Sequence, residues 1–273
     1  MRKFLLILIP LFSLGVLSLN AQQKLKCESF RKAKQGTYVI AHRGAHNGIP
    51  ENSLPAYQKA IDLGCDFVEI DVRTTKDGKF VSVHNSTVDN YVNGTTGKVS
   101  DMTLAELKSL DIGARIGENW KNTRIPTFEE ILALCKGKIG IYLDLKDAPV
   151  QELMNIIRKY NMESDVIWYV PSKYLLEMSN VDEMFGNSFI MPDPKKEENL
   201  PNVIKTLNPC VVATDMGVLS KDFVKTSQNA GAKVFVDEDK GTEVEWKQIL
   251  KWKTDGIQTD DPEKLIKFLK SKH

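Results

Sequence analysis

The feature that most constrains the fold is a regular alternation of short apolar runs and amphipathic segments that begins after Pro126. Runs of about four to eight apolar residues are typical of buried parallel strands, and apolar residues that recur every three or four positions are typical of helices. The predicted strands in this region are Ile139–Lys146, Val166–Val170, Ser188–Met191, Val211–Thr214, Lys233–Val236 and Gly256–Thr259. The predicted helices are Thr127–Cys135, Val150–Tyr160, Ser172–Asn180, Glu197–Leu207, Ser220–Ala230, Glu243–Trp252 and Pro262–Leu269.

Two further strands precede this region and complete the pattern. Tyr38–Ala41 and Asp66–Arg73 read as strands, and Ser53–Leu63 between them reads as a helix that Gly64 ends. Together the chain has eight strands in alternation with helices. We therefore predict an α/β fold of the TIM (β/α)8 barrel type.

The segment that follows the second strand does not fit the alternation. Lys76–Lys79 contains Asp-Gly and joins the second strand directly to another strand, Phe80–Val83. A parallel return would need a connection of about a dozen residues or more, so this strand is expected to be antiparallel. We predict a small insertion after the second barrel strand, at about residues 73–126, which is rich in loops and has one short helix, Thr103–Leu110.

The N-terminus has the layout of a secretory signal peptide, predicted at residues 1–21. A basic start, Met1–Lys3, precedes the apolar run Phe4–Leu19, and the sequence turns polar after it. An uncleaved anchor is the alternative, but a run of about 16 residues is short for a span of about 20. We expect an exported protein, periplasmic or secreted, whose mature residues 22–273 form a single barrel domain without a stable membrane span.

Charge and cysteine content limit the possible partners. The 273 residues carry a formal net charge of +1, so no strong field favours nucleic acid or an anionic membrane as a partner. Cys65, Cys135 and Cys210 fall in predicted elements and are expected to be buried, while Cys27 precedes the barrel. The cysteines and histidines lack the spacing of a zinc site, and we expect no essential disulfide. The sequence does not indicate an oligomeric state.

Acidic residues gather at predicted strand ends, where TIM barrels carry their active sites. Glu69 and Asp71 are two positions apart on one strand, so their side chains point the same way, roughly 6.5–7 Å apart along the chain. Asp144, on the next barrel strand, is a third candidate ligand. Exposed acids paired with basic residues are the alternative. The concentration on adjacent strand ends favours a site for a divalent cation such as Mg²⁺ or Ca²⁺.

Histidines and basic residues accompany these acids. His42 follows the first strand and His84 follows the hairpin strand, and an imidazole suits proton transfer near neutral pH. Arg43 and Lys146 are candidates for binding phosphate oxygens, although either could simply pair with the acids. His46 lies in a loop and is assigned a surface role. These residues predict a metal-assisted site that cleaves a phosphodiester.

The chain resembles the glycerophosphodiester phosphodiesterase family over nearly all of residues 38–269. The segments that carry the resemblance are His42-Arg43-Gly44, Pro50–Ser53, Gly64–Val72, Thr75–Gly78, Val83-His84, Ile125–Glu130, Leu143–Lys146 and Asp255–Pro262. Their joint occurrence is highly specific, whereas His-Arg-Gly alone is a weak signal. The resemblance implies a TIM barrel with an insertion and hydrolysis of small-molecule glycerophosphodiesters to glycerol 3-phosphate and an alcohol.

The resemblance also implies residue roles. It implies a divalent cation on Glu69, Asp71 and Asp144, general acid and base roles for His42 and His84, and phosphate binding by Arg43 and Lys146. It leaves open which histidine is the acid, and whether water or a glycerol hydroxyl attacks to give, in the second case, a cyclic phosphate.

Three positions depart from the family pattern. The family usually has Asp where Asn85 follows His84, and usually Glu where Asp144 stands. It usually has Trp-Thr at the end of the seventh strand, where this chain has Phe235–Asp239. That strand end shapes the alcohol pocket. Two alternatives therefore stay open: a phosphodiesterase acting on a lysophospholipid or phosphoinositol head group, and a non-catalytic exported protein that binds phosphodiesters.

Overall fold

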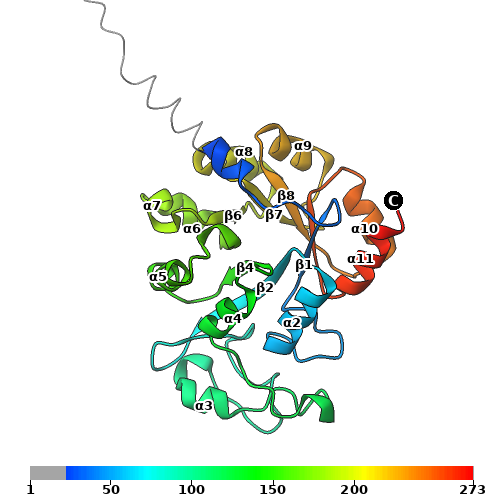
Figure 1. The fold of residues 1–273 in the computed structure, drawn as a ribbon. Coiled ribbons are helices and arrows are strands. Elements are labelled where there is room, and N and C mark those ends of the chain that lie inside the picture. Colours follow the sequence, from blue (N-terminus) through cyan, green and yellow to red (C-terminus); the bar gives the residue numbers. More distant parts are fainter. Residues whose placement is uncertain (1–22, 273) are drawn as a thin grey trace, which may run out of the picture. The chain divides into compact units, whose positions relative to one another are not determined.

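A nearly closed barrel of eight parallel strands forms the centre of the described part of the chain (Figure 1). The computed structural model describes residues 23–272. The strands are β1 (Tyr38–Ala41), β2 (Phe67–Thr74), β4 (Gly140–Leu145), β5 (Val166–Pro171), β6 (Phe189–Asp193), β7 (Val211–Asp215), β8 (Lys233–Asp237) and β9 (Gly256–Thr259). Their order is β6-β5-β4-β2-β1-β9-β8-β7, and the end strands β6 and β7 lie side by side without a ladder among these residues. The predicted TIM barrel is confirmed.

Helices surround the strands and bury apolar faces against them. They are α2 (Leu54–Leu63), α4 (Phe128–Cys135), α5 (Val150–Tyr160), α6 (Ser172–Glu177), α7 (Val181–Phe185), α8 (Leu200–Leu207), α9 (Lys221–Asn229), α10 (Glu243–Leu250) and α11 (Pro262–Lys270). Thr127 caps α4 in a capping box with Glu130. One helix prediction is wrong, because Ser172–Asn180 ends early, at Glu177, and the separate helix α7 follows. The polar pair Ser179-Asn180 favours turns over helix and separates the two.

The inner face of the barrel is filled in layers. Tyr38, Phe67 and Phe235 pack as one aromatic layer, with ring centroids 5.2–6.2 Å apart. A Cβ on Gly256 would lie 2.6 Å from the Phe235 ring, so only glycine fits there. Along β2, alternation then places Glu69 and Asp71 on the same face as Phe67, towards the carboxyl end. The aromatic layer therefore supports the acids from below.

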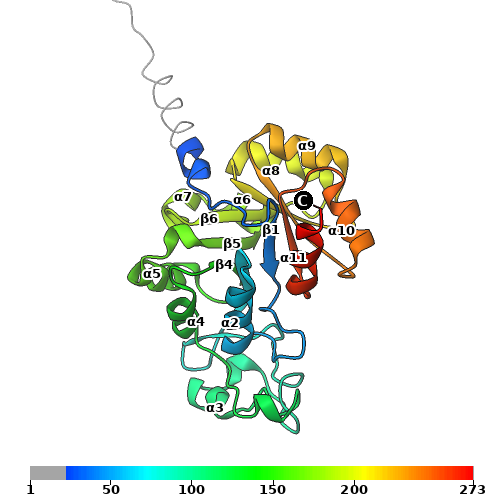
Figure 2. The same ribbon diagram turned by 45° about the vertical axis from the view of Figure 1, so that its right-hand side comes forward.

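The predicted insertion after the second barrel strand is also present. β3 (Phe80–Ser82) runs antiparallel to β2, after a turn in which Gly78 has φ of 69°. The remainder holds α3 (Leu104–Ser109) and surrounds a second apolar cluster built on Val81, Tyr91 and Leu107. Figure 2 shows α3 and its neighbouring loops projecting from one end of the barrel.

The first residues of the described chain form a separate unit. Contacts divide the chain at Arg31, and residues 23–28 are helical. The predicted signal peptide, residues 1–21, lies outside the described residues. Within residues 23–272, a search for helices of membrane-spanning length and hydropathy finds none.

Cysteine states differ in part from expectation. Cys65 and Cys135 are buried free thiols, as predicted. Cys210 is buried, as predicted, but it is also disulfide-bonded, as is Cys27, which the sequence did not lead us to expect. The spacing of the cysteines gives no local signal for a disulfide.

Candidate active site

Three carboxylates meet at the carboxyl ends of β2 and β4. One oxygen from each of Glu69, Asp71 and Asp144 lies within 4.8 Å of the others. The register places Asp71 directly opposite Asp144 across the parallel pair. Glu69 and Asp71 are almost fully buried, at 2% and 0% exposure. The structure thus brings together the three residues predicted as metal ligands.

The electrostatics of this cluster favour a cation. Burial and the charge of Asp71 raise the pKa of Glu69 well above its ordinary value, and burial also raises the pKa of Asp144. Lys146 Nζ lies 2.6 Å from Asp144 Oδ2 and 3.0 Å from Asp71 Oδ1. Burial would lower the pKa of Lys146, but these two carboxylates raise it. One ammonium cannot neutralise three carboxylates of which two are almost fully buried, so the donor set suits a hard divalent cation.

The turn after β1 carries the next two predicted residues, His42 and Arg43. Arg43 and Gly44 both have left-handed backbones, with φ of 51° and 84°. A Cβ on Gly44 would lie 2.8 Å from Ala56, so glycine allows the turn to rest against α2. In this tight turn, the backbone N–H of Arg43 donates to Glu69 Oε2 at 2.8 Å. Its guanidinium donates to Glu51 Oε1 at 3.1 Å and lies 3.8 Å from Asp71.

His42 is held by an aspartate that the sequence did not single out as a site residue. Its Nδ1 lies 2.7 Å from Asp260 Oδ1, just beyond β9. Burial alone would lower the pKa of His42, but the bond to Asp260 and the charge of Glu69 outweigh it and raise the pKa to about 9. The same bond lowers the pKa of Asp260. His46, predicted at the surface, has a half-buried ring whose Nδ1 lies 2.9 Å from the His42 carbonyl oxygen.

His84 comes from the insertion and is fixed by three neighbours. The backbone N–H of His84 donates to the Tyr91 hydroxyl at 2.9 Å, and its backbone carbonyl accepts from Arg73 Nη2 at 2.7 Å. Its Nδ1 lies 2.8 Å from Asn85 Oδ1. Asn85 therefore orients the ring as an aspartate could, with an amide oxygen in place of a charge.

Asn52 is a further residue of the site that sequence reasoning missed. Its Nδ2 donates to Asp71 Oδ2 at 2.7 Å, and its Oδ1 accepts from the Tyr57 hydroxyl at 2.9 Å and from Ser82 Oγ at 2.8 Å. The backbone at Asn52 is left-handed, with φ of 50°. Asn52 lies in Pro50–Ser53, one of the segments that carry the family resemblance, and this was the signal in the sequence that could have found it. The contacts of Asn52 join elements that are distant in sequence, so the sequence did not predict them.

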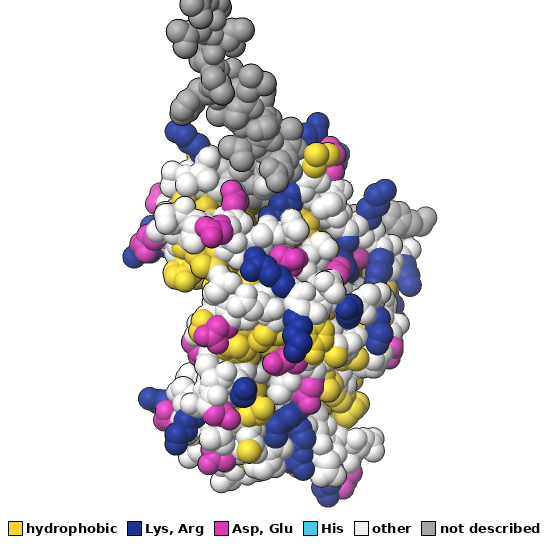
Figure 3. Space-filling model, turned by 60° about the vertical axis from the view of Figure 1, so that its left-hand side comes forward, with side chains coloured by type: hydrophobic (Ala, Val, Ile, Leu, Met, Phe, Trp, Pro, Cys, Tyr) yellow, Lys and Arg dark blue, Asp and Glu magenta, His cyan; other side chains and the backbone are white. Residues whose placement is uncertain are grey.

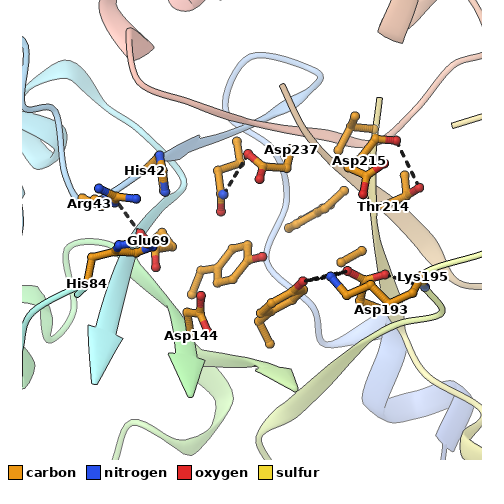
Figure 4. A pocket seen from close by; sticks show the side chains of 16 residues that line it. His42, Arg43, Glu69, His84, Asp144, Asp193, Lys195, Thr214, Asp215 and Asp237 are labelled. Carbon is orange, nitrogen blue, oxygen red and sulfur yellow. Dashed lines mark hydrogen bonds and ion pairs between the residues drawn. The ribbon is translucent and has the colours of Figure 1, made fainter. Parts of the chain in front are cut away.

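A cavity of about 240 Å³ opens at this end of the barrel. His42, Arg43, Glu69, His84 and Asp144 line one side of it (Figure 4). Asp71 and Lys146 do not line it and reach it only through Asp144 and Glu69. The other side, from the ends of β6, β7 and β8, carries further polar groups that are not among the predicted site residues. They are Asp193, Lys195, Thr214, Asp215 and Asp237.

The chain is similar in sequence to known phosphodiesterases. The model of a family described as the glycerophosphoryl diester phosphodiesterase family matches residues 42–264. A glycerophosphodiester phosphodiesterase of Caldanaerobacter subterraneus subsp. tengcongensis is 34% identical over 253 residues, which cover 86% of this chain and 98% of the relative.

Solved structures show the same fold at lower identity. A glycerophosphoryl diester phosphodiesterase of Parabacteroides distasonis aligns with a TM-score of 0.76 at 23% identity, over 91% of this chain and 92% of the other. A phosphodiesterase of Oleispira antarctica, solved with its product sn-glycerol-3-phosphate, aligns with a TM-score of 0.72 at 22% identity, over 85% and 96%.

Proposed function

The chain belongs to the glycerophosphoryl diester phosphodiesterase family, and we propose that it hydrolyses glycerophosphodiesters to glycerol 3-phosphate and an alcohol with a divalent cation bound at Glu69, Asp71 and Asp144. The relatives support phosphodiesterase chemistry. The observation that carries the detailed proposal is a cluster of three carboxylates, two of which line one cavity together with two oriented histidines.

A bound cation would supply positive charge beside the phosphate, at a site where buried carboxylates already favour one. Arg43 lines the same cavity and presents a guanidinium that can bind two phosphate oxygens. Lys146 holds Asp144 and Asp71, with which it forms ion pairs, and adds a second positive charge behind them. These groups neutralise a phosphodiester and the charge that develops on it in the transition state.

The two histidines suit opposite proton transfers. With Asp260 on Nδ1, His42 is protonated at neutral pH and leaves Nε2 to donate a proton to the departing alcohol oxygen. With Asn85 on Nδ1, His84 leaves Nε2 to accept a proton from the attacking water. The water oxygen forms a bond to phosphorus, and the bond from phosphorus to the alcohol oxygen breaks. The proton that His84 gains from the water and the proton that His42 gives to the departing alcohol balance.

Turnover coupled to detection of glycerol 3-phosphate tests the proposal. We expect activity on a panel of glycerophosphodiesters with Mg²⁺ or Ca²⁺, and its loss with chelator. Glu69→Gln and His84→Ala are each expected to lower kcat by at least about 100-fold. Asn122→Gly, in an exposed part of the insertion, is the control variant. Calorimetric binding of substrate and metal without release of product would instead favour the non-catalytic alternative.

We further propose that the protein is exported. The basic and apolar start of the sequence supports a signal peptide, and disulfide-bonded Cys27 and Cys210 fit an oxidising compartment. Fractionation of cells followed by N-terminal sequencing tests this: a mature protein that begins near residue 22 outside the cytoplasm is expected, and an intact Met1 in the cytoplasm would contradict it.

A further inference from the structure

The cavity has two sides of different chemistry (Figure 4). The side formed by β1, β2 and β4 carries the proposed cation ligands and Arg43, so it binds the phosphate. The opposite side, formed by β6, β7 and β8, carries the carboxylates of Asp193, Asp215 and Asp237 against one ammonium, that of Lys195. One substituent of a bound phosphodiester has to point towards this acidic side.

Two of the three carboxylates are already satisfied within the protein. Asp193 accepts the Tyr169 hydroxyl at 2.6 Å and pairs with Lys195 Nζ at 2.6 Å. Asp215 Oδ1 accepts the backbone N–H groups of Gly217 and Val218 at 2.9 and 3.1 Å, which fixes the turn after β7. Neither residue therefore lacks a partner.

Asp237 differs from them. Among residues 23–272 its carboxylate accepts one hydrogen bond, from Gln258 Nε2 at 3.0 Å, whereas Asp215 accepts two. Like Asp215, it forms no ion pair within 4.0 Å with a basic side chain of the described residues. Asp237 is exposed at the end of β8, at the mouth of the cavity. A carboxylate there that has no basic partner within the described chain can pair with a cation placed next to it.

Gln258 gives an independent sign of a missing ligand. It is 6% exposed and lines the cavity beside Asp237, and its Oε1 has no hydrogen-bond partner among the described residues. Buried amide oxygens in native proteins are nearly always paired, so a donor from a bound molecule is the natural completion. A donor that reaches both Asp237 and Gln258 would be an ammonium or a hydroxyl.

Aromatic groups favour the ammonium. Tyr142 and Tyr169 line the same cavity with ring centroids 5.7 Å apart, and Phe235 lines it as well. Ring faces next to a carboxylate attract amines and quaternary ammonium groups. At about 240 Å³, the cavity has room for a small head group but is below the usual size of a site for a larger ligand such as an acylated glycerol.

We propose that Asp237 is a specificity-determining residue that selects glycerophosphodiesters whose alcohol carries an amine or a quaternary ammonium. This rests on the proposed hydrolase function and names the substrate class of the same site. Asp237 stands in the strand end where this chain departs from the family's Trp-Thr pattern, so the preference is a property of this chain's own residues.

A matched pair of substrates tests the proposal: glycerophosphoethanolamine and its analogue with a hydroxyl in place of the amine. Wild-type enzyme is expected to prefer the amine on the order of tenfold in kcat/KM, and Asp237→Asn to abolish this ratio. Asp237→Glu, which keeps the charge, should retain part of it. Asp239→Asn removes the same charge two residues away, outside the cavity lining, and should keep the ratio in full.

An unchanged ratio in Asp237→Asn would overturn the proposal. In particular, equal losses on both substrates would mean that Asp237 binds the glycerol common to them. Loss of the ratio in Asp239→Asn would mean that only the long-range field matters, which also overturns it. If the wild type cleaves neither substrate, the proposed function fails instead. Calorimetric titration with phosphoethanolamine and with its hydroxyl analogue then tests the ammonium preference without turnover.

Discussion

At the scale of single residues, the site depends on side chains that hold other side chains. Asp260 orients the ring of His42, Asn85 orients the ring of His84, and Asn52 orients the carboxylate of Asp71. Such partners fix a reactive group in one geometry, and their loss lowers activity without removing the group itself. Two of them lend themselves to direct tests.

Asp260→Asn is expected to move the alkaline limb of the pH–rate profile to lower pH. The pKa of His42, about 9, lies above its ordinary value, so a protonated His42 is available at neutral pH and is lost as pH rises through that value. A cation on Glu69 removes part of the raising charge, so the wild-type limb should lie at or below pH 9. Profiles of kcat with saturating metal measure the shift. Asp62→Asn, on the exposed surface of α2, is the control and should leave the pH–rate profile unchanged. An unchanged alkaline limb in Asp260→Asn would refute the role of Asp260 in raising the pKa of His42.

Asn52→Gly is expected to weaken cation binding by about 10–100-fold, because the change removes the amide that orients Asp71. Glycine tolerates the left-handed backbone at this position, so the effect comes from the side chain. Titration calorimetry with Mg²⁺ and Ca²⁺ provides the measurement. Asn122→Gly is a matched control, since Asn122 is also left-handed, with φ of 68°, but lies far along the insertion. Equal affinity in Asn52→Gly and wild type would count against the assignment.

At the scale of elements, the site combines two supports. Glu69, Asp71 and Asp144 lie on barrel strands β2 and β4, whereas His84 follows β3 in the insertion. The insertion has its own apolar cluster around Leu107, which is fully buried. Cation binding and proton transfer should therefore respond separately to changes in these two supports.

Leu107→Ala is expected to lower kcat while leaving cation affinity near that of the wild type. Loss of a buried leucine costs about 2–5 kcal/mol, here within the cluster that supports His84. Hydrogen exchange should quicken over residues 80–125. Leu153→Ala, a buried leucine of α5 in the barrel cluster, should instead lower the midpoint of global unfolding. A parallel fall of cation affinity in Leu107→Ala would show that the two supports are not separable.

At the scale of the whole molecule, the groups of the proposed site are concentrated at one cavity. Acidic and basic side chains are interspersed over the face in Figure 3, in keeping with a net charge of +1. The barrel holds its buried carboxylates at the carboxyl ends of the strands. Stability should consequently depend on pH and on divalent cations together.

Cation-dependent stabilisation is expected to be larger at pH 8 than at pH 5. Glu69 has a raised folded pKa, so the folded state loses stability as pH rises above the ordinary value of about 4.5. The raised pKa of His42 acts in the same direction, because its contribution is lost as pH rises from about 6.5 to about 9. A bound cation offsets the carboxylate repulsion. Thermal unfolding with Ca²⁺ or chelator measures this, and Glu69→Gln should shrink the difference. A cation effect independent of pH would contradict it.

Much of the fold could be predicted because its signals are local. Apolar runs gave all eight barrel strands, and the Asp-Gly turn gave the antiparallel hairpin. Thr103 and Thr127, where two helices were predicted to begin, cap α3 and α4. The break between α6 and α7 and the disulfide-bonded state of Cys27 and Cys210 depend on tertiary context, which a local pattern does not carry.

The site residues also divide into those that local sequence signals predict and those that depend on tertiary contacts. Glu69 and Asp71 are two residues apart on one strand, and Asp144 lies on its neighbour, so periodicity alone brought them together. Asp260 reaches His42 across 218 residues of sequence, and Asn52 bonds to side chains from β2, α2 and β3. Their roles depend on contacts that form only in the folded barrel, so the sequence alone does not reveal them. The residue roles proposed for the cation and the proton transfers stay predictions.

The separate apolar cluster of the insertion has a consequence for how such enzymes diversify. The insertion has its own apolar cluster and pairs with the barrel through the β2–β3 ladder. Such a segment can be exchanged for another while the barrel is kept. Evolution could recruit a different proton acceptor, or retune its neighbours as at Asn85, while the cation ligands stay in place. Transplanting residues 75–126 from relatives offers a route to altered turnover on one unchanged scaffold.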